Sequence, residues 1–258
     1  MTALDPMASV SLHAIVLRRR DLGETDRIVT LLSQESGKLD AVAKGARKPG
    51  SKSSGASELF TLSHIQLAEG RRLGIVTQWL VLDAFTRIRA ELGLLARASY
   101  LCELTDKLVD DGEPCGEVYD LLRGALSLLE IGHGHPDTVV HAYELRLLEE
   151  RGYAPALGCC VRCGKEWKGS PAAFSPMAGG LLCRACRGGV EATVMVRPAT
   201  IQTMHTLKSG ELTELGAMEW KPGVAAEVEA CLNGCVRVRC ERDIRSARFL
   251  EMVRGTEV

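Results

Sequence analysis

The sequence contains no uninterrupted apolar run of about 18 residues, the length that a membrane-spanning helix needs, so we predict no such helix. Its first residues, "MTALDPMASVSL", also lack the basic start and apolar stretch of a secretory signal. We therefore expect a cytoplasmic protein. In that reducing compartment, its ten cysteines are better suited to metal binding or burial than to disulfide formation.

Motifs of common catalytic sites are missing as well. The chain has no glycine-rich loop of the kind that binds ATP phosphates or a dinucleotide. It also lacks the serine elbow of hydrolases and the paired-histidine zinc motif of metalloproteases. The acidic residues between Glu103 and Glu117 are typical of a solvated helix end. Because no residue stands out as a nucleophile, the sequence indicates a binding protein and not an enzyme.

Aromatic residues are scarce, at 4% of the chain. Proteins that bind single-stranded nucleic acid without sequence preference stack its bases on aromatic rings. The first 82 residues contain only Phe60 and Trp79, and both are candidates for the core. If this part of the chain binds nucleic acid, electrostatic attraction to the phosphate backbone must therefore supply most of the affinity.

The chain does have the composition of a globular protein, with 46% hydrophobic residues, 25% charged residues and a formal net charge of −1. Its charges are unevenly distributed. Residues 83–159 contain 7 Lys/Arg and 14 Asp/Glu, whereas residues 160–190 contain 5 Lys/Arg and 1 acid. This segregation favours a basic working face over a uniformly mixed surface.

Hydrophobic periodicity divides the chain into two kinds of structure. Five strand-like stretches joined by turn residues fill the first 82 residues and predict a small barrel, of which the OB-like barrel is one form. From about residue 87 the apolar residues recur with a helical period, and helices are expected to open at Pro136 and Pro198. We predict an α+β protein in which an N-terminal five-stranded OB-like β-barrel precedes an α-helical domain with a four-cysteine zinc-finger insert. The predicted parts are the barrel (residues 1–82), the first part of the helical domain (83–156), the insert (157–190) and the second part of the helical domain (191–258).

Four cysteines form two C-x2-C pairs, Cys160 with Cys163 and Cys183 with Cys186, with 19 residues between the pairs. This spacing is typical of a tetrahedral zinc site made of four thiolates. Cys159 is an alternative to Cys160, although its C-x3-C spacing is less suitable. We predict one structural Zn²⁺ without an open coordination position for catalysis. Cysteines on apolar helical stripes are interpreted as small buried residues: Cys102, Cys231 and Cys235.

Residues 41–60, "AVAKGARKPGSKSSGASELF", form a basic stretch rich in Gly, Ser and Pro. Composition leaves two interpretations open, a solvated linker and a loop that approaches phosphates through its glycines and attracts them through its cations. Arg18 and Arg20 end the first strand and should share one face, with Arg19 on the other, because strand side chains alternate. This nearby arginine run favours the phosphate-binding interpretation. We interpret the stretch as a mobile basic flap on the barrel.

Three segments together resemble the RecO family of bacterial recombination mediators. They are "AIVLRRRDLGETDRIVTLLSQESGKLDAVAKGARKPGSKSSG", the insert with "AFSPMAGGLLCRAC" and the late "RSARFLE". The resemblance implies an OB fold, a helical domain and a four-cysteine zinc site. It also implies binding to single- and double-stranded DNA, annealing of complementary strands, and cooperation with RecR in loading RecA onto SSB-coated DNA at the nucleoid. The basic positions that it carries over as DNA contacts are Arg18, Arg20, Lys38, Lys44, Arg47, Lys48 and Lys52.

The resemblance also implies contact with the acidic, apolar-ended tail of the single-strand-binding protein SSB. That contact requires a basic and apolar pocket on the helical domain. The candidate residues are Arg239, Arg242, Arg245, Arg248 and Phe249. The leading hypothesis is therefore a DNA-binding recombination mediator. The alternative is a zinc-ribbon adaptor that joins proteins without touching nucleic acid, and a test of DNA binding separates the two.

Overall fold

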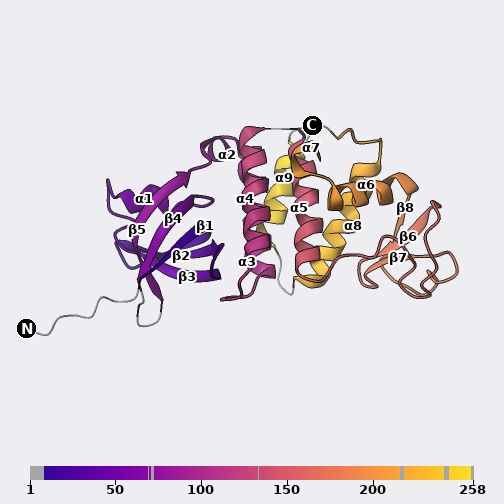
Figure 1. Cartoon of the computed structure of the whole chain (residues 1–258). Helices are drawn as coiled ribbons and strands as arrows, with labels where there is room; N and C mark the ends of the chain where they lie inside the picture. The colour runs from indigo at the N-terminus through magenta and orange to yellow at the C-terminus, as the bar shows by residue number, and fades with distance from the viewer. Residues whose placement is uncertain are drawn as a thin grey trace, which may run out of the picture. The chain divides into compact units, whose positions relative to one another are not determined.

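The computed structural model describes residues 9–68, 70, 73–132, 134–215, 218–240 and 244–256. The chain divides into two compact units (Figure 1). The first comprises residues 1–130 and 246–258, and the second comprises residues 131–245. Each unit is described separately below.

The first unit begins with a closed five-stranded barrel in which the strands follow the order β1-β2-β3-β5-β4. Neighbouring strands are antiparallel except for β3 and β5, which pair in parallel. A short helix, α1, lies between β3 and β4 in the sequence. The barrel confirms the predicted five-stranded OB-like architecture. Its elements are β1 (Ser9–Leu22), β2 (Asp26–Ser33), β3 (Gly37–Ala43), α1 (Lys52–Ala56), β4 (Leu62–Ala68) and β5 (Gly74–Asp83).

Alternation along the strands builds the barrel core. On β1, Leu12, Ala14 and Val16 point inward and pack with apolar residues of the other four strands. Ile15 and Leu17 on the opposite face are also buried, because helix α3 packs against β1. Both faces of the middle of β1 are therefore apolar, which explains the continuous run "AIVL" in the sequence.

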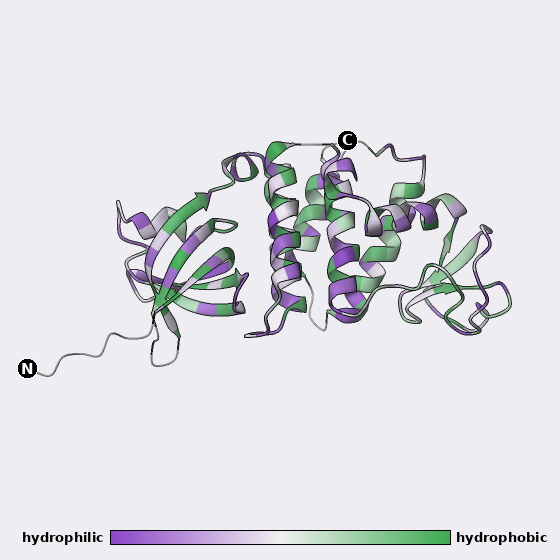
Figure 2. Cartoon of the chain, in the orientation of Figure 1, coloured by the Kyte–Doolittle hydropathy of each residue, from purple (hydrophilic) through white to green (hydrophobic). Residues whose placement is uncertain are grey.

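The rest of the first unit is helical. Its helices are α2 (Thr86–Ala90), α3 (Leu92–Leu108), α4 (Gly116–Ile131) and α9 (Arg245–Arg254). In Figure 2 the long helices carry both hydrophobic and hydrophilic bands. On α4 the buried residues include Val118, Leu122, Ala125 and Leu129, which lie on one stripe at helical spacing. The predicted change from strand to helical period near residue 87 is confirmed.

The second unit combines helices with a small three-stranded sheet of order β7-β6-β8. Pro136 and Pro198 occupy the first turns of α5 and α6, as predicted. Helix α8 packs against α5, α6 and two strands of the sheet. No helix among the residues described here is long and apolar enough to cross a membrane. The elements are α5 (Pro136–Glu150), β6 (Ala172–Ser175), β7 (Gly180–Leu182), β8 (Val194–Val196), α6 (Pro198–Ser209), α7 (Leu212–Leu215) and α8 (Val224–Arg239).

Candidate metal centre and nucleic-acid interface

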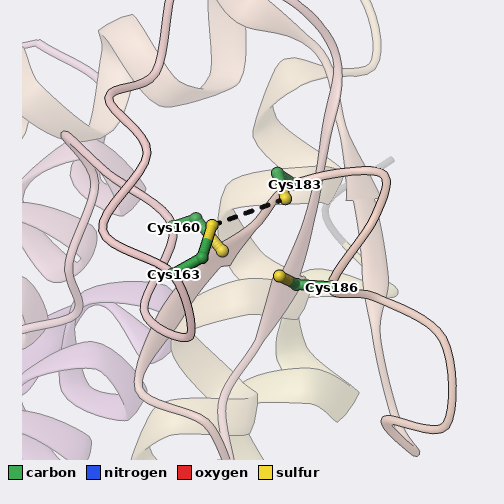
Figure 3. Close-up of side chains that lie close together, drawn as sticks. All are labelled: Cys160, Cys163, Cys183 and Cys186. Carbon is green, nitrogen blue, oxygen red and sulfur yellow. Dashed lines mark hydrogen bonds between the residues drawn. The ribbon is translucent and has the colours of Figure 1, made fainter.

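The four predicted cysteines converge in the second unit (Figure 3). Their Sγ atoms all lie within 4.8 Å of one another, and those of Cys163 and Cys183 are 3.9 Å apart. Four sulfurs bound tetrahedrally at about 2.3 Å stand about 3.8 Å from one another, so this cluster has room for one metal ion. Cys160 is the member of the cluster and Cys159 is not, which decides between the two alternatives.

Tight backbone turns present the thiols. In the first turn, the Gly164 N–H donates to the Cys160 carbonyl at 2.8 Å, and Gly164 adopts a φ of +69°. A glycine takes this left-handed conformation at little cost. In the second turn, the N–H groups of Cys186 and Arg187 donate to the Cys183 carbonyl at 3.0 and 3.1 Å. Each C-x2-C pair therefore forms a compact knuckle with both sulfurs on one side.

The small sheet holds the two knuckles together. The N–H of Val161, in the first knuckle, donates to the Leu181 carbonyl of β7 at 2.9 Å. Ala156 exchanges hydrogen bonds with Gly179 and Leu181, and a Cβ on Gly180 would lie 2.4 Å from the Ala156 carbonyl oxygen. The buried apolar cluster around the site is small. It consists of Cys160, Ala173 and Leu182, with Val161, Cys183, Cys186 and Val190 packed against it.

The local hydrogen bonds favour the thiolate at Cys160 and Cys183 but not at Cys186. The backbone N–H of Cys183 is the main cause that lowers the pKa of the Cys160 thiol to about 6. The backbone N–H of Cys186 similarly lowers the pKa of Cys183. Hydrogen bonds with Cys183 and Cys163 raise the pKa of Cys186 to about 12.

Two of the predicted DNA-binding arginines lie on the outer face of the barrel. Arg18 donates to the Thr30 hydroxyl at 3.3 Å, and Arg20 donates to Asp40 at 3.1 Å. Thr30 in turn donates to Asp40 at 2.6 Å, so β1, β2 and β3 share one polar row. Arg18 also pairs with Asp106 of α3 at 3.5 Å. Both arginines remain exposed, at 55% and 58% of their side chains, although each faces an acid.

Arg19 points away from this row. It forms an ion pair with Glu58, which also accepts a hydrogen bond from Arg27 at 3.0 Å. The predicted alternation of Arg18, Arg19 and Arg20 is therefore confirmed.

Lys38 has a different environment from the other predicted contacts. Its side chain is only 11% exposed, and its ammonium donates to the Asp106 carbonyl at 2.7 Å. It also pairs with the carboxylates of Asp106 at 3.5 Å and Asp111 at 3.2 Å. Lys38 therefore joins β3 to the end of α3 and the residues that follow it, and a phosphate could reach the ammonium only by displacing these acids.

The base of the basic loop is anchored to the turn between β1 and β2. Asp26 accepts the Gly45 N–H at 2.8 Å, and this bond, with one from the Thr25 hydroxyl, lowers the pKa of Asp26. The Arg47 backbone N–H donates to the Thr25 carbonyl at 2.9 Å, and its guanidinium donates to the Gly23 carbonyl at 2.7 Å. These bonds anchor residues 45–47 to the β1–β2 turn, and the expected mobility of the basic stretch stays a prediction.

The remaining cations of the loop are exposed lysines. Ala46 is fully buried in the barrel core, which fixes the path of the backbone on either side of it. Lys44, Lys48 and Lys52 are exposed, and none of their ammonium groups forms an ion pair or hydrogen bond with another described residue. The loop therefore presents three exposed lysines without a direct ion pair to a described residue, and two of them, Lys44 and Lys48, help to lower the pKa of Asp26.

Comparison with known proteins identifies the family. The family model described as Recombination protein O N terminal matches residues 7–85, and that described as Recombination protein O C terminal matches residues 89–248. A DNA repair protein RecO of Symbiobacterium thermophilum is 33% identical over 251 residues, which cover 96% of this chain and 99% of the relative. Another, of Roseiflexus sp., is 39% identical over 242 residues, which cover 94% of this chain and 85% of the relative.

The chain belongs to the RecO family. This is a family of non-enzymatic recombination mediators in DNA repair, so the chain is not an enzyme, as its sequence predicts. The resemblance inferred from the barrel segment and the cysteine insert is confirmed.

The predicted partner-binding residues of this RecO-family chain come from both units. Arg239 ends α8 in the second unit, and its guanidinium lies 4.5 Å from the centre of the Tyr153 ring, in a cation–π contact. Arg245 begins α9, on which Arg248 is exposed and Phe249 is partly buried. Arg242 lies outside the described residues. The assignment of these residues to the SSB tail stays a prediction.

Sequence reasoning missed two acids that organise the barrel's basic residues. Asp26 orients the loop through Gly45, and Asp106 binds Lys38 from α3. The only local signal is for Asp26, which follows the turn residues Gly23 and Thr25. Lys38 and Asp106 are 68 residues apart, and no short-range pattern connects them.

Proposed function

We propose that this protein binds single- and double-stranded DNA through its barrel, anneals complementary strands, and helps to load RecA onto SSB-coated DNA together with RecR. The observation that carries the proposal is the set of exposed loop lysines that form no ion pair or hydrogen bond with a described residue: Lys44, Lys48 and Lys52. OB-fold proteins bind oligonucleotides with the face of strands 2 and 3 and the loop between strands 1 and 2. Membership of the RecO family supports the same conclusion.

The strand register connects these lysines to the outer arginines. Ala43, the residue before Lys44, lies opposite Arg27 of β2, which in turn lies opposite Asp21 of β1. Arg20 directly precedes Asp21 on β1, so the arginine row and the start of the loop lie at the same end of the barrel. We assign the strongest phosphate contacts to the free lysines. Arg18 and Arg20 contribute less because Asp40 and Asp106 already neutralise part of their charge.

Charge neutralisation is the mechanism that these contacts support. Two DNA strands repel each other through their phosphates, and cations that reduce this repulsion let complementary bases meet. Stacking on barrel aromatics contributes little, since Phe60 is 1% exposed and Trp79 packs against the barrel core. Arg47 and Lys38 support the surface by anchoring the loop and joining β3 to the end of α3.

We further propose that the cysteine cluster holds one Zn²⁺ through Cys160, Cys163, Cys183 and Cys186. Four thiolates at tetrahedral spacing suit zinc, and they leave no coordination position for a water or substrate. When bound, the metal supplies a structural cross-link between the two knuckles. The small apolar cluster around the site supports a need for such a cross-link.

The partners follow from the family. We propose that RecR and the SSB tail bind this protein, that RecA is reached indirectly, and that the protein acts on the nucleoid in the cytoplasm. The basic residues Arg239, Arg242, Arg245 and Arg248, with Phe249, suit an acidic tail with an apolar end.

An annealing assay tests the proposed function. Two complementary oligonucleotides, one with a fluorophore and one with a quencher, are mixed with wild-type protein or with the variant Lys44→Ala/Lys48→Ala/Lys52→Ala (the loop variant). We expect the loop variant to anneal the strands at least about tenfold more slowly near 100 mM salt, because it loses three phosphate contacts. Equal rates for the two proteins contradict the proposal.

The matched control removes three exposed cations elsewhere, as Lys107→Ala/Lys221→Ala/Arg237→Ala (the control variant). It has the same formal charge as the loop variant. A purely non-specific effect of net charge slows both variants equally, whereas the proposal requires the control variant to anneal like the wild type.

A further inference from the structure

A cleft of about 380 Å³ lies beside the cysteine cluster. Its walls come from the two segments that carry the metal-binding knuckles. One segment supplies Cys160 and residues 165–168 and 170–172, and the other supplies residues 181–184. A metal ion that orders the two knuckles also fixes both walls of this cleft.

The rim of the cleft is basic. Lys165, Lys168 and Arg184 are exposed, and none of their side chains forms an ion pair or hydrogen bond with a residue that the structure describes. Glu166 is the single acid among the lining residues. Nearby Arg162, by contrast, donates to the Cys186 carbonyl at 3.2 Å. The rim therefore offers three cations that no other contact neutralises.

An indole ring forms part of the lining between these cations. Trp167 is partly buried, and its Nε1–H donates to the Ser170 carbonyl at 2.7 Å. Its backbone N–H donates to the Gly158 carbonyl at 2.9 Å. These two bonds restrict the side chain and satisfy its only polar group, so the remaining surface that Trp167 offers to a ligand is apolar.

We propose that this cleft is a second contact for single-stranded DNA, in which one unpaired base stacks on Trp167 while Lys165, Lys168 and Arg184 bind the adjoining phosphates. The combination of an aromatic platform with unpaired cations is the one by which proteins hold single strands without sequence preference. The inference rests on the proposed function, because it concerns the same DNA. It gives each of the two units a DNA contact of its own.

The accessible lining fits a base better than an acidic peptide with an apolar end. Such a peptide needs aliphatic surface into which its apolar side chains can be buried. The two leucines of the lining, Leu181 and Leu182, are 2% and 0% exposed and Ala172 is 8% exposed, so Pro171 supplies most of the aliphatic surface that a peptide could use. A flat base needs only one aromatic face. The bases of a duplex are already stacked and paired, so duplex DNA does not use Trp167.

Paired variants of Trp167 test the proposal. Binding is measured with a labelled oligothymidylate and with a duplex of equal length. We expect Trp167→Ala to weaken single-strand binding about 5- to 100-fold, whereas Trp167→Phe, which keeps an aromatic face, stays within about threefold of the wild type. Binding of duplex DNA to both variants stays within about twofold. The metal content of each protein is also measured. If Trp167→Ala has lost its metal, its insert has not folded, and single-strand binding is then compared between Trp167→Phe and the wild type.

Tryptophan fluorescence supplies a second readout that a merely structural role would not change. Stacked thymines quench a contacted indole, so oligothymidylate should quench the wild type and should quench Trp167→Phe far less. Trp79, packed against the barrel core, and Trp220, which donates to the Thr138 hydroxyl, remain in that variant as internal references.

The outcomes separate this inference from the proposed function. If the loop variant binds DNA weakly while Trp167→Ala binds oligothymidylate like the wild type, the cleft proposal is overturned and the barrel proposal stands. If neither variant changes DNA binding, both are overturned. If Trp167→Ala loses binding of an acidic, phenylalanine-ended peptide but keeps DNA binding, the cleft is a peptide site and the proposal is wrong.

Discussion

The salt dependence of DNA binding gives the sharpest quantitative prediction. Each phosphate that a protein neutralises lowers the slope of log K against log salt by about 0.7 on single strands and about 0.9 on duplex DNA. Among the barrel residues that the structure describes, the cations without an ion pair or hydrogen bond are Lys44, Lys48 and Lys52, and these alone give a slope of about −3 on a duplex. A single strand also engages the three cations of the cleft, which gives about −4.

The single-strand slope is therefore expected to be steeper than the duplex slope. If single strands and duplex DNA used the same contacts, the duplex slope would be the steeper one. A slope of −4 also means that single-strand affinity falls about 250-fold between about 50 and 200 mM salt. Fluorescence anisotropy with a labelled single strand and a labelled duplex, over this range of salt, measures both slopes.

The loop variant isolates the barrel contribution. We expect its slopes to become shallower by about 2 on the single strand and by about 3 on the duplex, while the control variant keeps the slopes of the wild type. If the loop variant keeps the wild-type slopes, the three lysines do not contact phosphates and the reasoning is refuted. The same conclusion follows if the control variant loses as much slope as the loop variant.

Three further predictions concern stability and the metal. Replacing the buried Lys38 by methionine should lower the free energy of unfolding by about 1–3 kcal/mol in urea titrations. It should leave the salt dependence of DNA binding unchanged. A shallower salt slope in this variant shows instead that Lys38 contacts DNA. Burial alone raises the pKa of Glu227, but hydrogen bonds from Thr200 and Arg197 outweigh burial and lower it. Glu227→Ala should therefore lower the free energy of unfolding by about 1–2 kcal/mol at pH 7. This loss should shrink as the pH falls below 4.5, the pKa of the glutamate in the unfolded chain. A loss that does not depend on pH contradicts a stabilising role for the Glu227 carboxylate. Removing the metal with a strong chelator should make residues 157–190 sensitive to protease, and an insert that resists equally with and without chelator is not metal-stabilised.

The features that sequence predicts well are those encoded at short range. The two C-x2-C pairs define the four-cysteine cluster because each knuckle is built from neighbouring residues, and the 19-residue gap is long enough to bring the pairs together. Alternation on β1 similarly separates Arg18 and Arg20 from Arg19. Pro136 and Pro198 mark helix starts because proline suits a first turn.

The features that it predicts poorly depend on distant partners. Composition treats Lys38 and Lys44 alike, yet Lys38 is buried by Asp106 from a helix 68 residues away while Lys44 stays exposed. Arg47 likewise looks like any loop cation until the fold brings it to Gly23. Lys165, Trp167 and Lys168 are neighbours in the sequence, but the cleft that they line also needs residues 181–184 from the second knuckle segment, which no short-range pattern connects to them.

Annealing of SSB-coated strands tests the central claim most directly. Complementary strands are coated with SSB and mixed with wild-type protein, the loop variant or the control variant. The account predicts that the wild type and the control variant anneal the coated strands, and that the loop variant is slower by at least about tenfold. If the wild type fails to anneal coated strands, or the loop variant anneals them as fast as the wild type, the assignment of mediator function to this barrel surface is contradicted.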